Sequence, residues 1–314
     1  MPPRPVIIDC DPGHDDAIAV LMALASPEAL QVLGITCVAG NAPLARTEVN
    51  ARGICVLAGR PDLPVFAGCT RPLMRPLKTA AAIHGESGMD GSGLPEEPEM
   101  PSQGRHAVDF IVDTCLSAAD REITLCVLGP MTNIAMALSR APDIVPKIRE
   151  IAFMGGAALG PGNVTPSAEF NIYTDPHAAR IVFRSGAPLT MFGLDVTHQV
   201  ITTPQRLAGI GGIDTPVGRA AFGMLNYYDR CEPERYGERG SPLHDPCVIA
   251  WLLRPELFRG RRVHVEVETD SPLTMGRTVV DWWGVTGAPA NATVMEAADA
   301  DGFYALLTDR LSRL

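Results

Sequence analysis

Four aspartates lie close together near the start of the sequence, in the stretch Asp9-Cys10-Asp11-Pro12-Gly13-His14-Asp15-Asp16. The apolar run Val6–Ile8 before them predicts a short buried strand, and Ile18–Met22 after them predicts a helix. The carboxylates would therefore gather where a strand ends and a helix begins, which is where open α/β sheets bind ligands. Carboxylates this close repel one another unless a cation lies among them. Ca²⁺, which takes about six to eight oxygen ligands, would relieve that repulsion.

A helix N-terminus also attracts aspartate as a cap, and this would account for Asp15 or Asp16. It does not account for Asp9 and Asp11 as well. The spacing excludes an EF-hand calcium loop, because the sixth position counted from Asp9 is His14, where that loop needs glycine. The residue types therefore favour a metal site over a cap, and His14 itself is expected to face solvent at the start of the helix.

The rest of the chain alternates between predicted strands and helices. Strands are expected at Val6–Ile8, Leu30–Val38, Val65–Ala67, Ile123–Leu128, Ile151–Met154 and Leu189–Phe192, and helices at Ala45–Ala58, Ala107–Ala118 and Asp175–Ser185. This alternation predicts an open, mostly parallel α/β sheet with helices on both faces. Two later strand-like runs, Val263–Thr269 and Arg277–Trp282, have no helix between them and predict an antiparallel extension, so the sheet should be mixed. We see no linker and no repeat, and therefore expect residues 1–314 to form a single domain.

The candidate site residues follow the predicted strands. Asn41, His84, Leu128 and Met154 lie in or at the edges of the connecting segments, as does the irregular stretch from Ala157 to Asn171. The segment from Gly68 to Gly104, which contains His84, is rich in Pro and Gly and is expected to be a functional loop or a lid. His244-Asp245 opens a late helix, where Asp245 is either a cap or a site residue.

Composition limits the possible partners. The 314 residues are 46% hydrophobic, with a net charge of -10 and no long basic stretch. This argues against nucleic acid and membrane surfaces as partners. No apolar run is long enough to span a membrane, and the start lacks the apolar core of a secretory signal. The eight cysteines are scattered without a C-x-x-C pair, which predicts buried thiols in a reducing compartment. We therefore expect a soluble, cytoplasmic protein.

Short motifs follow one another along the chain from Asp9 to Asp245. They are the N-terminal signature Asp9-x-Asp11-Pro-Gly-x-Asp15-Asp16-Ala and then Gly40-Asn41, His84-Gly85, Leu128-Gly129-Pro130-Met131-Thr132-Asn133, Met154-Gly155-Gly156, Gly162-Asn163-Val164-Thr165-Pro166, Glu169-Phe170-Asn171 and His244-Asp245. These motifs resemble those of the inosine-uridine preferring nucleoside hydrolases and recur in the order of that family, whose N-terminal signature is very similar. This ordered set, spread over about four-fifths of the chain, makes the resemblance specific.

The resemblance implies hydrolysis of ribonucleosides to ribose and free base, on an open sheet with a Rossmann-like core. It implies Ca²⁺ as the cofactor, a homo-oligomer (tetramer or dimer) and a role in nucleoside catabolism and salvage. The implied metal ligands are Asp11, Asp16, Asp245 and the backbone carbonyl of Leu128, and the implied general base is Asp15. The implied ribose-binding residues are Asn41, Asn163, Glu169 and Asn171, with Met154 along the sugar.

These residue types suit the chemistry. Breaking an N-glycosidic bond builds positive charge on the ribose, which nearby carboxylates stabilise. The ribose hydroxyls need donors and acceptors at fixed positions, and Asn and Glu supply them. The departing base carries negative charge unless it is protonated, and histidine can donate a proton near neutrality. We therefore expect His244 to be the acid, with His84 as its rival and Tyr236 able to relay a proton to either.

The preferred base is predicted to be a pyrimidine, as in uridine or cytidine. The signature with His14 is similar to that of bacterial pyrimidine-preferring members, and Tyr236 falls where those members also carry Tyr. Glu232 departs from their Gln at its position, and Glu offers no amide donor. Tyr227 and Tyr228 could instead stack on a purine. A purine-accepting or broad inosine–uridine specificity is therefore the alternative.

Two other classes of protein remain as alternatives. A nucleoside-binding protein that has lost turnover is disfavoured, because every catalytic position that the resemblance implies is present. A metal-dependent phosphohydrolase also uses clustered aspartates, but such sites usually hold Mg²⁺ and need cationic groups for phosphate. The matched motifs carry Asn, Glu and Asp and no Lys, which disfavours that class.

Overall fold

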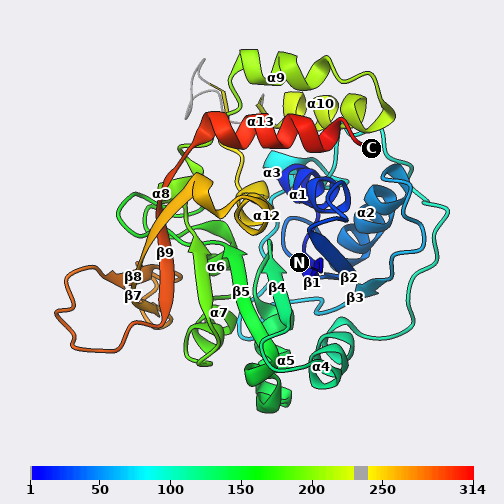
Figure 1. Ribbon diagram of the computed structural model, residues 1–314. Coiled ribbons are helices and arrows are strands. Elements are labelled where there is room, and N and C mark those ends of the chain that lie inside the picture. Colours follow the sequence, from blue (N-terminus) through cyan, green and yellow to red (C-terminus); the bar gives the residue numbers. More distant parts are fainter. Residues whose placement is uncertain (1, 230–239) are drawn as a thin grey trace.

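The computed structural model of the protein describes residues 2–229 and 240–314 (Figure 1). The described residues contribute nine strands to one sheet, in the order β3-β2-β1-β4-β5-β6-β9-β7-β8. The strands are β1 (Arg4–Cys10), β2 (Leu30–Cys37), β3 (Val65–Ala67), β4 (Ile123–Val127), β5 (Ile148–Met154), β6 (Leu189–Phe192), β7 (Phe258–Val267), β8 (Thr278–Asp281) and β9 (Ala292–Ala298).

The sheet is mixed, as predicted. Strands β3, β2, β1, β4, β5, β6 and β9 pair in parallel, whereas β7 pairs antiparallel with both β8 and β9. Strand β1 lies between β2, which follows it, and β4, which comes much later, so the strand order reverses beside β1. A crevice at the carboxyl ends of the strands is expected at such a reversal. The fold therefore places the turn that carries Asp11, Asp15 and Asp16 at the point where an open sheet binds its ligand.

Helices cover both faces of the sheet (Figure 1). They are α1 (His14–Leu24), α2 (Leu44–Leu57), α3 (Ala81–His84), α4 (Ala107–Ser117), α5 (Thr132–Arg140), α6 (Phe170–Thr174), α7 (Pro176–Phe183), α8 (Leu194–Thr197), α9 (Pro204–Gly211), α10 (Pro216–Asp229), α12 (Pro246–Leu253) and α13 (Ala300–Leu311), with 3₁₀ turns at Pro142–Lys147 and Pro255–Leu257. Among the described residues, no helix has the length and apolar content to cross a membrane.

Successive side chains of β1 point to opposite faces of the sheet, so this strand contributes to both apolar layers of the core. Val6 and Ile8 pack with residues of α1, α12 and α13 on one face. Ile7 packs with residues of α4, α5 and α7 on the other. Every residue of α1 is buried, because α12, α10, α2 and α13 surround it. The helix that carries the acidic turn is thus fixed on all sides.

Asp9, the first of the four aspartates in the sequence, points to the α5 side of the sheet. One carboxylate oxygen accepts hydrogen bonds from the Thr36 hydroxyl at 2.6 Å and from Asn133 Nδ2 at 2.8 Å. Asn133 also donates to the Cys37 carbonyl and accepts from the Cys69 backbone N–H. Burial raises the pKa of Asp9 to about 7. Asp9 therefore links β1 to Thr36 of β2 and to Asn133 of α5.

Some predicted elements differ from the structure. Strand β9 (Ala292–Ala298) was not predicted, although its pairing with β6 extends the parallel sheet. Strand β7 begins at Phe258, before the predicted start at Val263, because Arg259–Arg262 form an exposed part of the ladder to β9. The predicted buried thiols are Cys10, Cys37, Cys55, Cys115, Cys126 and Cys247, with Cys69 half-buried, and all seven are free. Cys231 lies outside the described residues.

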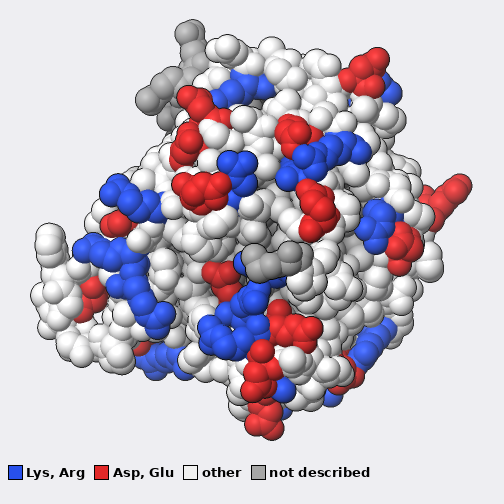
Figure 2. Space-filling view, in the orientation of Figure 1, with Lys and Arg blue, Asp and Glu red and all other residues white. Residues whose placement is uncertain are grey.

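Side chains of both charge signs appear over the face seen in Figure 2. Several basic side chains of the protein pair with acidic ones, as in Arg206–Asp301 and Arg310–Glu28. Exposed pairs of this kind contribute little to stability because water screens them. The fold is therefore stabilised mainly by its two apolar layers.

Candidate active site

The turn between β1 and α1 brings its carboxylates together through its own backbone. Asp16 accepts hydrogen bonds from the backbone N–H of Gly13 at 2.9 Å and of Asp11 at 3.2 Å. This arrangement satisfies N–H groups near the start of α1, and the positive end of the helix dipole favours the negative charge. Asp16 is therefore both part of the acidic group and the residue that shapes the turn.

Asp11 lies directly after β1 and is fully buried. Its Oδ2 accepts from the backbone N–H of Asn41 at 2.6 Å, whereas its Oδ1 has no hydrogen-bond partner among the described residues. A Cβ atom on Gly40 or Gly129 would lie 2.0 or 2.2 Å from the Asp11 carboxylate, so only glycine fits at either position. The carboxylate thus lies in a space that backbone from three loops encloses.

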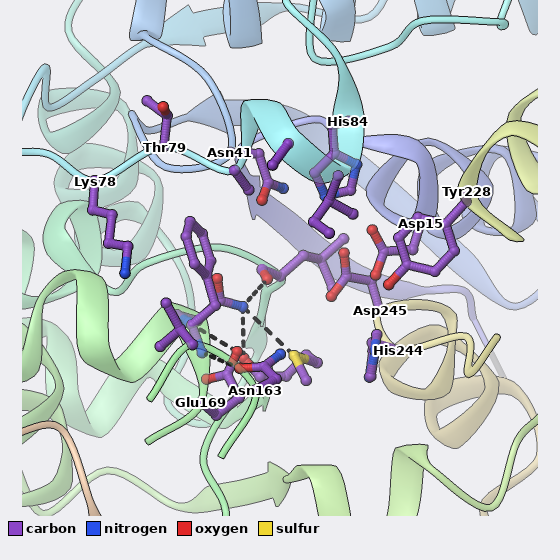
Figure 3. A pocket seen from close by; sticks show the side chains of 18 residues that line it. Asp15, Asn41, Lys78, Thr79, His84, Asn163, Glu169, Tyr228, His244 and Asp245 are labelled. Atoms are coloured by element: carbon purple, nitrogen blue, oxygen red, sulfur yellow. Dashed lines mark hydrogen bonds between the residues drawn. The ribbon is translucent and has the colours of Figure 1, made fainter. Parts of the chain in front are cut away.

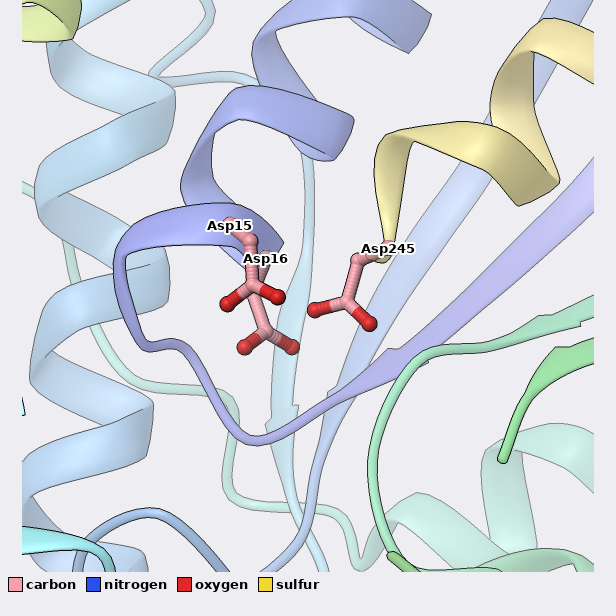
Figure 4. A group of neighbouring side chains, drawn as sticks. All are labelled: Asp15, Asp16 and Asp245. Carbon is pink, nitrogen blue, oxygen red and sulfur yellow. The ribbon is translucent and has the colours of Figure 1, made fainter. Parts of the chain in front are cut away.

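Asp245 does not act as a helix cap. It precedes α12 in helical conformation, and its side chain makes no capping hydrogen bond. Its carboxylate instead lies with those of Asp15 and Asp16, and one oxygen from each falls within 4.8 Å of the others (Figure 4). Of the two roles predicted for Asp245, the structure therefore favours membership of the acidic group over capping of the helix.

The acidic group is electrostatically strained. Burial, together with repulsion from Asp16, raises the pKa of Asp15 to about 7, and burial raises that of Asp16 to about 6. The pKa values of Asp11 and Asp245 are also raised, by burial and then by the neighbouring carboxylates. A cation among them would remove this penalty. The group offers hard oxygen donors, including the unpartnered Asp11 Oδ1, and no described His or Cys belongs to it, so it fits a hard divalent ion.

Leu128 directly follows β4 and brings its carbonyl to the same edge of the sheet. Asn171 Nδ2 donates to that carbonyl at 2.6 Å and to the Met154 carbonyl at 3.2 Å. A carbonyl oxygen has a second lone pair, so the bond to Asn171 leaves Leu128 able to contact a cation. Asn171 thus ties together the ends of β4 and β5.

A cavity of about 220 Å³ opens beside the acidic group (Figure 3). It is lined by Asp15, Asn41, Lys78, Thr79, Ala80, Ala82, Ile83, His84, Leu128, Met154, Asn163, Val164, Glu169, Phe170, Asn171, Tyr228, His244 and Asp245. Most of the residues singled out from the sequence therefore meet at one place. Asp11 and Asp16 are fully buried and do not line the cavity. Tyr236 and Glu232 lie outside the described residues.

Lys78 is the cation that sequence reasoning missed. It lies across the cavity from Tyr228 and Asp245 in Figure 3, and its Nζ is 5.2 Å from the centre of the Tyr173 ring. It comes from the long loop, where no periodic pattern indicated which residues would face the cavity. The absence of lysine from the matched motifs therefore did not mean that the site lacks one.

The polar floor of the cavity is fixed by backbone hydrogen bonds. Glu169 caps α6, accepting from the backbone N–H groups of Gly156 at 2.9 Å, Asn171 at 2.8 Å and Ile172 at 3.1 Å. Asn163 Oδ1 accepts from the Phe170 N–H at 2.9 Å. Burial raises the pKa of Glu169, and these N–H groups oppose that rise. The floor is therefore preorganised.

Two imidazoles lie on the other side of the cavity. The Nδ1 of His244 is 2.8 Å from the Thr197 hydroxyl, and burial lowers the pKa of His244 to about 3. Burial also lowers the pKa of His84 well below its usual range, and His84 stacks against Tyr228 with ring centres 5.8 Å apart. Both rings are therefore neutral as they stand.

The prediction that His14 faces solvent is wrong. His14 is fully buried, because the long loop folds over the start of α1 and covers it. It does not line the cavity, so it does not contact a ligand there directly. The local sequence showed only a helix start and could not show what would pack on it.

The long loop is tied to the acidic turn at several points. Asn50 Nδ2 bridges the carbonyls of Pro12 and Ser87, at 3.1 and 3.0 Å, and the Ala80 N–H donates to the Asn41 carbonyl. Residues 78–80 and 82–84 of the loop line the cavity. The loop thus forms one wall of the site, and its movement as a lid stays a prediction.

Comparison with known proteins gives a consistent result. The family model described as inosine-uridine preferring nucleoside hydrolase matches residues 6–305. The chain is 47% identical over 308 residues to a pyrimidine-specific ribonucleoside hydrolase RihA of Salmonella agona, covering 98% of both chains. It is 47% identical over 310 residues to a protein of the same name from a Shewanella species, covering 98% of this chain and 96% of the relative.

Solved structures agree on the fold. A plant nucleoside hydrolase, PpNRh1, superposes with a TM-score of 0.91 at 34% identity and 99% coverage of both chains. A purine-preferring ribonucleoside hydrolase from Gardnerella vaginalis superposes with a TM-score of 0.91 at 33% identity and 98% coverage of both. Relatives that are named for different bases therefore share this architecture.

Proposed function

The chain belongs to the family of inosine-uridine preferring nucleoside hydrolases, and we propose that it hydrolyses pyrimidine ribonucleosides with Ca²⁺ as its cofactor. As a member of the family it is a ribonucleoside hydrolase, an enzyme that cleaves an N-glycosidic bond. The observation that carries the proposal is that carboxylates, an amide-lined floor and two imidazoles meet in one cavity. The expected cytoplasmic location and dimeric or tetrameric assembly stay predictions.

Asp11, Asp16, Asp245 and the Leu128 carbonyl would hold the cation. The unpartnered oxygen of Asp11 and the raised pKa values of the acidic group support this assignment. When bound, a divalent cation polarises a water molecule and positions the substrate.

Asp15 is the proposed general base. Of the carboxylates in the β1–α1 turn, only Asp15 lines the cavity, so it faces the side from which water and substrate approach. Asp16, its neighbour, is committed to the backbone N–H groups of the turn. Asp15 can therefore take a proton from the attacking water without loosening the turn.

The amide floor would bind the ribose. Asn41, Asn163 and Asn171 line the cavity with Glu169, and their positions are held by backbone hydrogen bonds. Such a site favours hydroxylated sugars, because a substrate without the hydroxyls would leave buried polar groups unpaired. The carboxylates beside the floor would stabilise positive charge on the ring in the transition state.

His244 is the proposed acid for the leaving base. When the Thr197 hydroxyl donates to Nδ1, the hydrogen of the neutral ring lies on Nε2, where it can bond to the base as that base departs. Support for a pyrimidine comes from relatives named pyrimidine-specific at 47% identity, against 33% for the purine-preferring structure. The stack of Tyr228 on His84 would suit a purine as well, so broad specificity is the second candidate.

The substrate proposal is tested by product analysis. We expect the enzyme to release free base from uridine and cytidine with a higher kcat/KM than from inosine or adenosine. Chromatography of the four reactions, at equal enzyme concentration, measures this. A higher kcat/KM for inosine would overturn the pyrimidine assignment, and equal values would establish the broad specificity.

The metal proposal is tested by chelation and by thermal stability. We expect exhaustive chelation to abolish turnover and Ca²⁺ to restore it, whereas Zn²⁺, which prefers nitrogen and sulfur ligands, should not. Because a ligand of the folded state stabilises it, Ca²⁺ should also raise Tm. Asp11→Asn should lose that rise, and Asp214→Asn, at an exposed position, should keep it. Full activity after chelation would contradict the proposal.

The base assignment is tested by Asp15→Asn. We expect kcat to fall by about 10²-fold or more, the effect typical of a lost general base. The Ca²⁺-induced rise in Tm should persist, since Asp15 is assigned to the water and not to the ion. A near-normal kcat would disprove the base role, and loss of the Tm rise would make Asp15 a ligand instead.

The acid assignment is tested with two leaving groups. His244→Ala should lower kcat for uridine far more than kcat for p-nitrophenyl riboside, because an activated phenolate leaves without a proton. His264→Ala, on β7 far along the chain, serves as the control. If both substrates lost the same factor, His244 would be a structural or ribose-positioning residue.

A further inference from the structure

The segment from Ala157 to Ala168, here called the 157–168 loop, connects β5 to α6 without forming a helix or a strand. Asn163 and Val164, near its middle, line the cavity. Asn163 shares the floor of the cavity with Glu169 (Figure 3). Because the loop has no regular pairing of its own, other parts of the fold must hold Asn163 in place.

The start of the loop is held through its backbone N–H groups. The carboxylate of Asp195, on α8, accepts from the N–H of Ala158 at 2.6 Å, of Leu159 at 2.9 Å and of Gly160 at 2.8 Å. Hydrogen bonds to a carboxylate are stronger than those to a neutral acceptor. Asp195 therefore fixes three successive peptide groups against α8.

The same stretch is held through its carbonyls by Arg277, a half-buried residue that directly precedes β8. Its Nη2 donates to the Ala158 carbonyl at 2.8 Å, and its Nη1 donates to the Gly160 carbonyl at 3.1 Å. Nη1 also donates to the Ser167 carbonyl at 3.3 Å, near the other end of the loop. One guanidinium therefore joins the two ends of the loop, and Asn163 lies between them in the chain.

The middle of the loop is a tight turn. The N–H of Gly162 bonds to the Pro166 carbonyl, and the N–H of Asn163 bonds to the Ala168 carbonyl, both at 3.1 Å. A Cβ atom on Gly162 would lie 2.1 Å from the Ala168 carbonyl oxygen, so the turn requires glycine there. These bonds shape the turn, whereas its place relative to the sheet depends on contacts outside it.

We propose that Arg277 is a positioning residue, which keeps Asn163 at the ribose by joining the two ends of the 157–168 loop. Arg277 does not line the cavity, so it acts through the loop and not on the substrate. The antiparallel extension of β7 and β8 thereby takes part in the active site. The ribose as the ligand of Asn163 rests on the proposed function, whereas the bridging of the loop does not.

A guanidinium suits this place better than an ammonium group. Its terminal nitrogens donate in fixed directions from two separate atoms, as the carbonyls of Ala158 and Ser167 require. Lysine offers donors from one atom only, so Arg277→Lys should keep part of the bridge. Arg277→Met keeps an unbranched apolar stem without any N–H and should lose the bridge entirely.

The first test is hydrogen–deuterium exchange of the intact protein, read by mass spectrometry. In Arg277→Met we expect the amides of residues 157–168 to exchange about tenfold faster, since one hydrogen bond is worth about that factor. The amides of β1 and β4 should keep their rates, and Arg277→Lys should give an intermediate rate in the loop. Arg262→Met is the matched control, because Arg262 also donates to a backbone carbonyl, that of Ala290.

The second test is a double-mutant cycle in kcat/KM for uridine. Asn163→Ala removes the side chain that Arg277 is proposed to position. We expect Arg277→Met to lower kcat/KM about tenfold in the wild type and to add little in the Asn163→Ala background. A merely structural role would give the same factor in both backgrounds. Because the loop lies on the ribose side, p-nitrophenyl riboside should lose the same factor as uridine.

The outcomes separate this inference from the proposed function. Unchanged exchange of residues 157–168 in Arg277→Met would overturn the bridge, whatever the enzyme hydrolyses. Faster exchange with equal kinetic losses in both backgrounds would overturn the positioning of Asn163. If the wild type hydrolyses neither substrate, the proposed function fails, and the exchange rates still decide whether Arg277 holds the loop. If Arg277→Met does not fold, Arg277→Lys takes its place in both tests.

Discussion

The mutual repulsion of buried carboxylates at the end of β1 is the constraint on which the rest of this structure depends. Asp11, Asp15, Asp16 and Asp245 are all buried, and each raises the cost of charge on its neighbours. The protein offsets part of that cost with backbone N–H groups and the N-terminus of α1. One Asp11 oxygen stays unpartnered among the described residues. The remainder of the cost is what a divalent cation would remove.

The sequence was sufficient to predict this end of the sheet because its signals are local. The acids, the turn and the first helix are consecutive, and the alternation of strands and helices places Asn41 and Leu128 after β2 and β4 and Met154 at the end of β5. The predictions fail where contacts are long-range. His14 was expected in solvent because nothing near it reveals that residue 90 would cover it. Lys78 and β9 were missed for the same reason, since a loop without periodicity and a strand late in the chain gain their places only from distant partners.

The proposed ribose side and the proposed base side of the cavity are built differently. The ribose side consists of groups at strand ends and at the start of α6, held by backbone hydrogen bonds such as those to Glu169. The base side comes from the long loop and from α10, through His84 and Tyr228, with His244 between the two. Contacts between side chains fix this second wall, and a few substitutions can therefore change it.

This division accounts for relatives that share a fold but are named for different bases. A purine-preferring hydrolase superposes with a TM-score of 0.91, although only 33% of its residues are identical. A change in the parallel sheet or the acidic turn would disturb the grouping of Asp15, Asp16 and Asp245, whereas the loop wall can vary without moving them. In this chain that wall is backed by His14, whose buried ring stacks on His84 from behind. Base preference could therefore be altered by residues that never touch the base, provided that they set the position of a ring in that wall.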